Sequence, residues 1–327
     1  MLTVTALALL WLFATGHGIV WPIYLIAVAA SASRAFHNPA SQAIIPGLVP
    51  PDTLASAIAF ASGTFQAAQI LGPALGGILY ALDARLPFAL AGALYATSAL
   101  AAYMIRPRAG ETATNLPVTL RSLLAGFEFA LAKPVVLGAI LLDAMVVMFG
   151  GVVLLLPIFA KDILQVGPVG LGILRAAPAV GAIGMAMWLA NSDYVQHHAG
   201  ARLLRTVAVF GAATACFGLS GSLVLSLACL IVVGASDMIS VVIRHTRVQA
   251  ETPEHLRGRV SAVNSLFLTS SSELGQLRAG MLAGLLGAVP AVVLGGLAAI
   301  GFSLVWPRLF PELADRDRLI GAESARA

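Results

Sequence analysis

Charged side chains are scarce in this sequence. Asp, Glu, Lys and Arg together make up only 10% of its residues, whereas soluble proteins average about 25%. Hydrophobic residues make up 59%, and the mean hydropathy is +0.92. So few polar side chains cannot cover the surface of a water-soluble domain. The composition therefore excludes a soluble globular protein and predicts a polytopic membrane protein that is surrounded by a lipid bilayer.

The residues and motifs of common catalytic and metal sites are also missing. The two cysteines, Cys216 and Cys229, lie in apolar runs with no metal ligand beside them, so we interpret both as small buried hydrophobic residues. No phosphate-binding loop, Cys-x-x-Cys pair or nucleophile–base arrangement is present. These absences predict no cofactor and no metal, and they argue against an enzyme, including one that acts on lipid. The basic residues that give the net charge of +4 lie in short segments between apolar runs, so we expect no nucleic-acid partner.

Ten apolar runs organise the chain. About 20 apolar residues are enough to cross a hydrocarbon core as a helix, so we predict an all-α membrane bundle of about ten transmembrane helices. The first run is short and starts at the first methionine, which indicates either a chain that begins inside a helix or a short tilted or interfacial helix. The runs are Leu2–Thr15, Ile19–Phe36, Ala55–Tyr80, Pro87–Ile105, Val135–Phe159, Gly170–Ala190, Leu203–Leu219, Leu223–Val242, Val260–Leu286 and Ala291–Trp306.

One long polar segment divides these runs into four and six. It spans residues 107–134 and contains a predicted amphipathic helix near Leu120–Leu131. We therefore expect an incomplete amino-terminal half (1–106), a linker (107–134), a six-helix half (135–306) and a tail (307–327). Most of the 19 Lys and Arg residues fall on the side of the bundle that holds the linker. The positive-inside rule then predicts that the linker, the tail and both termini are cytoplasmic.

The run Ala55–Tyr80 has an unusual set of small and polar residues. Its only strongly polar side chains are Gln66 and Gln69, one helical turn apart, which would line a cavity or clamp neighbouring helices. Glycines four residues apart allow close helix packing, while a proline inside a membrane helix bends it without ending it. The pattern therefore fits either a helix-packing face or the hinge helix of a transporter. The residues concerned are Gly72, Pro73, Gly76 and Gly77.

Three acids lie inside predicted spans, where ionisable groups are costly and are functional candidates. Asp143 among apolar neighbours suits reversible protonation, or it is a helix-end carboxylate that reaches the headgroups. Glu273 is a candidate for coupling or substrate contact, or a structural acid paired with an arginine of a neighbouring helix. Asp237 shares one helix face with Arg244, which we expect at the rim of the membrane, with the acid deeper.

Basic residues give weaker candidates. Arg34 lies near a helix end, where its side chain either extends to the headgroups or, beside His37 and Asn38, serves substrate binding or gating. The second half of the chain echoes the first, since Pro51-Asp52-Thr53-Leu54 and Pro253-Glu254-His255-Leu256 each precede a helix rich in small residues. Two halves that repeat one plan are typical of transporters.

Several segments together resemble the major facilitator superfamily. Within it, they are similar to bacterial exporters of the enterobactin-exporter group. The resemblance covers nearly the whole chain, and it depends on the order and spacing of the motifs. They include Arg34-Ala35-Phe36-His37-Asn38-Pro39-Ala40, Gly72-Pro73 with Gly76-Gly77, Arg257-Gly258-Arg259-Val260-Ser261-Ala262, and Glu273-Leu274-Gly275.

This resemblance implies a fold of twelve helices in two halves, of which the chain supplies helices three to twelve. The Gly72–Gly77 segment resembles the antiporter signature of proton-coupled exporters, and Arg257, Gly258 and Arg259 would lie on a cytoplasmic loop. The implied function is secondary transport in a bacterial inner membrane, exporting a small amphipathic compound such as a siderophore or a drug-like molecule in exchange for protons, by alternating access. The alternative is a truncated, non-transporting remnant or a fragment that needs a partner chain, because the glycine-rich loop expected after helix two is not found.

Overall fold

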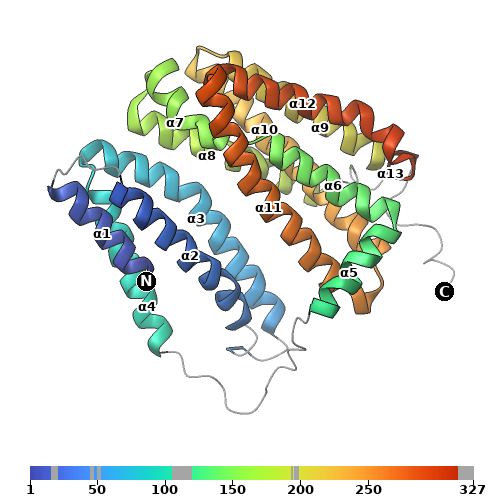
Figure 1. Ribbon diagram of the computed structural model, residues 1–327, viewed down its shortest axis with the longest axis horizontal. Coiled ribbons are helices and arrows are strands. Elements are labelled where there is room, and N and C mark those ends of the chain that lie inside the picture. Colours follow the sequence, from blue (N-terminus) through green and yellow to red (C-terminus); the bar gives the residue numbers. More distant parts are fainter. Residues whose placement is uncertain are drawn as a thin grey trace. The chain divides into compact units, whose positions relative to one another are not determined.

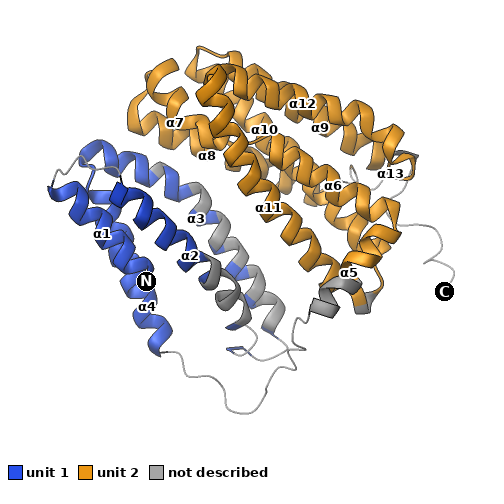
Figure 2. Cartoon of the chain, in the orientation of Figure 1, with its two compact units in different colours: residues 1–116 blue, residues 117–327 orange. Residues whose placement is uncertain are grey.

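The computed structural model describes residues 1–15, 21–44, 48–49, 53–104, 120–192, 194 and 199–315, and every regular element in these residues is helical (Figure 1). The chain divides into two compact units, unit 1 (residues 1–116) and unit 2 (residues 117–327), shown in Figure 2. The boundary between the units falls within the polar segment 107–134.

The described residues of unit 1 form four helices. α1 packs along α2 and α4, and α3 packs along α4. Between α1 and α4, the rings of Phe13 and Phe88 stack with centroids 4.9 Å apart, and Gly92 lies beneath the Leu7 side chain. The helices are α1 (Leu2–Thr15), α2 (Trp21–Ile44), α3 (Leu54–Leu82) and α4 (Leu86–Met104).

Helix α3 passes through Pro73 without ending, as expected for a proline in a membrane helix. It stops at Asp83, whose carboxylate accepts a hydrogen bond from the Arg85 backbone N–H at 2.8 Å. Apart from the adjoining backbone of α3 itself, no atom of the described residues lies within 4 Å of the position that a Cβ on Gly72 or Gly76 would occupy. The close-packing interpretation of this glycine face is therefore not realised in the described structure of unit 1, where α3 packs along α4.

Unit 2 is a larger bundle. α10 lies between α8 and α9, α12 packs along α9, and α11 packs along α5 and α6. The amphipathic helix predicted near Leu120–Leu131 is confirmed as α5. The helices are α5 (Leu120–Ala132), α6 (Pro134–Phe149), α7 (Leu156–Ile158), α8 (Gly167–Ala190), α9 (Ala199–Leu219), α10 (Leu223–Glu251), α11 (Glu254–Leu286), α12 (Ala288–Leu309) and α13 (Pro311–Asp315).

Several glycines in unit 2 allow helices to approach closely. A Cβ on Gly211 of α9 would lie 2.5 Å from the carbonyl oxygen of Gly296 on α12, and a Cβ on Gly296 would lie equally close to the Gly211 carbonyl. On α8 and α10, Gly181 and Gly234 each face backbone atoms of the other helix in the same way. Close packing through small residues is therefore found at the α9–α12 and α8–α10 crossings. For the glycine face of α3 it stays a prediction.

Each of the ten predicted runs overlaps a helix, but the helices often extend past the apolar residues. α10 continues to Glu251 rather than ending near Val242, and α11 begins at Glu254 rather than Val260. These boundaries were wrong because the apolar residues end at the edge of the lipid, whereas the helix and its backbone hydrogen bonds continue into the polar region.

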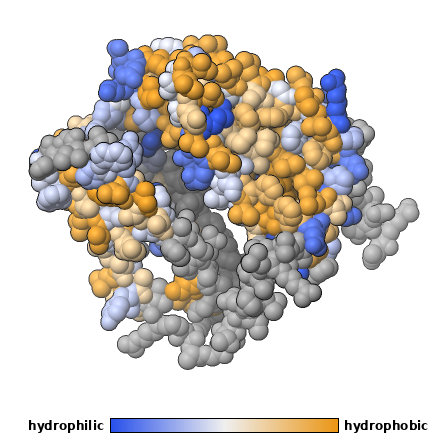
Figure 3. All heavy atoms as spheres, viewed as in Figure 1, coloured by the Kyte–Doolittle hydropathy of each residue, from blue (hydrophilic) through white to orange (hydrophobic). Residues whose placement is uncertain are grey.

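In the described residues, six helical segments are long and apolar enough to cross a membrane, so the expected count of ten remains a prediction. Apolar residues also make up most of the coloured surface in Figure 3. The six spans are Leu86–Met104, Pro134–Ile163, Gly167–Ala190, Ala199–Leu219, Leu223–Glu251 and Ala288–Leu309.

Candidate functional site: a buried ion pair between α6 and α10

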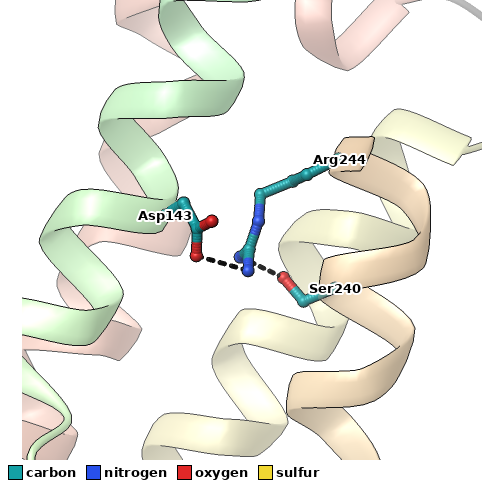
Figure 4. Close-up of polar contacts among 3 residues, drawn as sticks. All are labelled: Asp143, Ser240 and Arg244. Atoms are coloured by element: carbon teal, nitrogen blue, oxygen red, sulfur yellow. Dashed lines mark hydrogen bonds and ion pairs between the residues drawn. The ribbon is translucent and has the colours of Figure 1, made fainter. Parts of the chain in front are cut away.

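An ion pair joins α6 to α10 inside unit 2. The Arg244 Nη2 atom lies 2.5 Å from the Asp143 Oδ1 atom, and Arg244 Nη1 donates a hydrogen bond to the Ser240 hydroxyl oxygen, also at 2.5 Å (Figure 4). Ser240 and Arg244 are four residues apart on α10, so both side chains lie on one face of that helix. The guanidinium is therefore held by its own helix on one side and by α6 on the other.

The pair is almost completely removed from solvent. Asp143 is 5% exposed and Arg244 is 3% exposed. Apolar residues of α6 and α10, including Leu142, Val146 and Ile243, belong to the surrounding core cluster. Isolated charges are costly in such a place, and only close pairing with additional hydrogen bonds makes them tolerable. The pair therefore ties the position of α6 to that of α10.

Asp237 adds a second carboxylate on α10. It is half-buried, seven residues before Arg244, and it interacts electrostatically with both Arg244 and Asp143. Two carboxylates thus lie within electrostatic reach of one guanidinium.

These positions change one of the expectations for this region. Asp143 is not a helix-end carboxylate that reaches the headgroups, because it is buried and paired. Arg244 is buried as well, and its place at the rim of the membrane stays a prediction. We had considered that Glu273 pairs with an arginine of a neighbouring helix. In the structure, Asp143 makes such a pair, with Arg244.

Glu273 lies apart from this site. Its side chain is exposed on α11, and within the described ranges no ion pair or hydrogen bond joins it to another residue. A role for Glu273 in coupling or substrate contact stays a prediction.

The predicted candidates of unit 1 are not part of the pair. Arg34 and His37 are exposed on α2, while the side chain of Asn38 lies outside the described residues. Gln66 and Gln69 belong to α3, and their side chains also lie outside the described residues. The same helix carries Gly72, Pro73, Gly76 and Gly77.

The segment Arg257-Gly258-Arg259 is helical, so its expected placement on a loop was wrong. Helix α11 begins at Glu254, and the backbone N–H groups of Leu256 and Arg257 both donate to the Pro253 carbonyl. Proline favours this position because a helix start does not need its missing N–H. The Arg259 backbone then packs directly against Gly126 of α5.

A second polar contact crosses unit 2 where α6 ends. The span Pro134–Ile163 is interrupted after Phe149 by Gly150 and Gly151, then continues through a 3-10 turn, α7 and a π-helical turn. Carbonyl groups at a helix end lack partners within the helix. Arg278 of α11 is the partner of two such carbonyls at the end of α6. Its Nε donates a hydrogen bond to the Met148 carbonyl at 3.1 Å, and its Nη2 donates one to the Phe149 carbonyl at 2.8 Å.

The sequence analysis did not identify these carbonyls as partners of an arginine. The Gly150-Gly151 pair inside a predicted span is the signal that could have indicated a helix break. The guanidinium also lies 4.9 Å from the centre of the Phe149 ring. Its positive charge complements the negative end of the α6 dipole.

Known proteins share both the sequence pattern and the fold. The sequence profile of the Major Facilitator Superfamily matches residues 1–276. The enterobactin exporter EntS of Escherichia coli O1:K1 / APEC is 30% identical over 288 residues, which cover 86% of this chain and 66% of that protein. EntS of Shigella boydii serotype 18 (strain CDC 3083-94 / BS512) has the same identity to this chain and the same coverage of both sequences. The chain thus spans 66% of the length of these relatives.

A solved structure described as that of a bacterial metal transporter has the same fold. Its TM-score is 0.63 at 17% sequence identity, and the match covers 96% of this chain and 82% of that one. At this identity the likeness concerns the fold alone.

Proposed function

The chain belongs to the Major Facilitator Superfamily, and from this membership we propose that it is a secondary active transporter that exports a small amphipathic compound in exchange for protons. The observation that carries the proposal is the buried Asp143–Arg244 pair. It joins two helical segments that are each long and apolar enough to cross a membrane. Ionisable groups are retained at such depth mainly where ions or substrates pass.

The pair offers a physical means of coupling. A proton on the Asp143 carboxylate cancels the charge that Arg244 faces, and it leaves a buried guanidinium without its counter-ion. The arrangement of α6 against α10 then loses an important restraint. A two-state element whose balance depends on one protonation event is the basis of a switch.

The proposed substrate class comes from the similarity to the enterobactin exporter EntS. We take the substrate to be a siderophore or a drug-like molecule of similar character. The proposed place of action is a bacterial inner membrane, with both termini on the cytoplasmic side, because the positive-inside rule favours that orientation.

Transport by the purified chain in liposomes tests this function. An imposed proton gradient should drive accumulation of a catecholate siderophore or a lipophilic cationic dye, and an uncoupler should abolish it. Asp143→Asn should lose most of the uncoupler-sensitive transport, while Asp162→Asn, which changes an exposed acid at the end of the span, should keep it.

Two results would contradict the proposal. Accumulation that continues in the presence of the uncoupler would overturn proton coupling. A folded chain that moves neither class of compound in liposomes would overturn the transport function itself. Glu273→Gln in the same assay decides whether the exposed acid of α11 takes part.

A further inference from the structure

A small polar pocket lies beside the ion pair, between α6, α10 and α11. Its polar lining consists of the pair itself, His245 and Gln249 from α10, and Ser261 and Asn264 from α11. The enclosed part has room for about one water molecule. Asp143 and Arg244 are buried, while His245 and Gln249 are exposed. The pocket thus leads from an exposed position on α10 to a carboxylate that is otherwise sealed.

The chemistry of the lining suits water better than an ion. Arg244 and Asp143 cancel each other's charge, so no net charge selects an anion or a cation. The amides of Gln249 and Asn264 and the hydroxyl of Ser261 can each both donate and accept hydrogen bonds. Arg244 Nε, in a side chain that is 3% exposed, has no hydrogen-bond partner among the described residues. A buried donor of this kind is usually satisfied by ordered water.

We propose that this pocket binds a water molecule that passes protons between the His245 side and the Asp143 carboxylate. The inference rests on the proposed proton coupling and names the route by which the proton reaches its acceptor. In the inward step, hydronium at the exposed side gives a proton to the bound water. That water releases one of its protons to an Asp143 oxygen, where a new O–H bond forms, and the water is neutral again. The Asp143–Arg244 ion pair is lost in the same step.

The proton route can be blocked by a substitution that leaves the charges around Asp143 unchanged. The charged or titratable groups that act on Asp143 in the described structure are Arg244, Asp237 and His245, all from α10. α11 contributes only the uncharged Ser261 and Asn264 to the pocket. Replacing Asn264 by leucine keeps a similar volume, removes the hydrogen-bonding groups and leaves every nearby charge in place.

The rate of Asp143 protonation in the full chain tests the route. Time-resolved infrared spectroscopy after a rapid pH jump, in detergent, follows the carboxyl band that Asp143→Asn removes. Asn264→Leu should slow protonation by about tenfold or more, which corresponds to a barrier higher by about 1.4 kcal/mol. Asn264→Ser, which keeps a polar group and leaves room for water, should restore most of the rate. Gln276→Leu, the same change of an amide to leucine at an exposed position of α11, should have no effect.

Equal rates in the wild-type chain and in Asn264→Leu would overturn the proposal. If Asn264→Leu does not fold, Ser261→Val takes its place, with the same expected slowing and the same criterion. A chain in which Asp143 takes up no proton over the pH range where it stays folded also overturns the route. Loss of siderophore or dye transport with a normal protonation rate would contradict the proposed function and leave the route intact.

Discussion

Unit 1 and unit 2 are built from similarly apolar helices, yet they differ sharply in how much of each helix is buried. In the most apolar stretch of α4 in unit 1, 6% of the residues are buried, against 50% for the span Pro134–Ile163 and for α9 in unit 2. Ala6, Leu12 and Gly92 are the buried residues among the described side chains of unit 1. Apolar composition therefore decides that a segment prefers lipid, but it does not decide which helices touch.

The same contrast holds for polar contacts. Unit 2 contains the Asp143–Arg244 pair and the Arg278 contacts with the end of α6, each of which joins residues far apart in the chain. In the described part of unit 1, hydrogen bonds such as those from the Thr64 hydroxyl to the Phe60 carbonyl and from the Thr97 hydroxyl to the Leu94 carbonyl are local. The long-range polar contacts make unit 2 the place where a single change should have the largest effect.

The largest expected effect comes from breaking the buried pair. Arg244→Leu leaves Asp143 buried without its counter-ion, and we expect a loss of about 3–5 kcal/mol of unfolding free energy. Thermal unfolding of the purified protein in detergent measures it. Arg34→Leu removes an exposed arginine of unit 1 and should change stability by no more than about 0.5 kcal/mol. Equal effects at the two sites would mean that the units do not differ in this respect.

The second effect concerns the break in the span. Arg278→Met removes two charge-assisted hydrogen bonds from the end of α6, and we expect a loss of about 1.5–3 kcal/mol. Hydrogen exchange of the amides after Phe149 should increase at the same time, because the turn loses its restraint. Arg259→Met, at an exposed position of the same helix, is the matched control. Unchanged exchange in Arg278→Met would show that the glycines alone define the break.

A pair of glycine substitutions sharpens the contrast in packing. Gly211→Ala places a methyl group against the backbone of Gly296, and overpacking of this kind costs about 1–3 kcal/mol. Gly76→Ala in α3 meets no described atom and should be neutral or stabilising by up to about 1 kcal/mol, because alanine favours helix more than glycine does. A destabilising Gly76→Ala would indicate that this face of α3 is covered in the membrane.

The smallest effect is expected inside unit 1. The stacked rings of Phe13 and Phe88 are a defined contact between α1 and α4. A double-mutant cycle with Phe13→Leu and Phe88→Leu should give a coupling energy of about 0.5–1.5 kcal/mol, as for other aromatic pairs. A coupling near zero would mean that α1 and α4 are held together without this contact.

Part of the site could be predicted from the sequence. Asp143 and Asp237 are recognisable because an acid in an apolar run is rare and costly. Nothing in the sequence connects Asp143 with Arg244, because no periodicity relates residues on helices that are far apart in the chain. Glu273, an acid of the same kind, proves to be exposed on α11. The difference between these acids depends on which side of each helix is covered by its neighbours.

Composition and hydropathy alone indicated that this chain belongs in lipid, roughly where its helices lie, and that a polar segment divides them into two groups. These properties are local, since each backbone group in a membrane must find its hydrogen-bond partner within its own helix, whatever surrounds it. Only the packing of the helices shows that Asp143 meets Arg244, that Arg278 holds the end of α6, and that Gly211 lies against Gly296 of α12. Ion pairs and steric contacts act over a few ångströms, so they depend on which helices become neighbours when the chain folds.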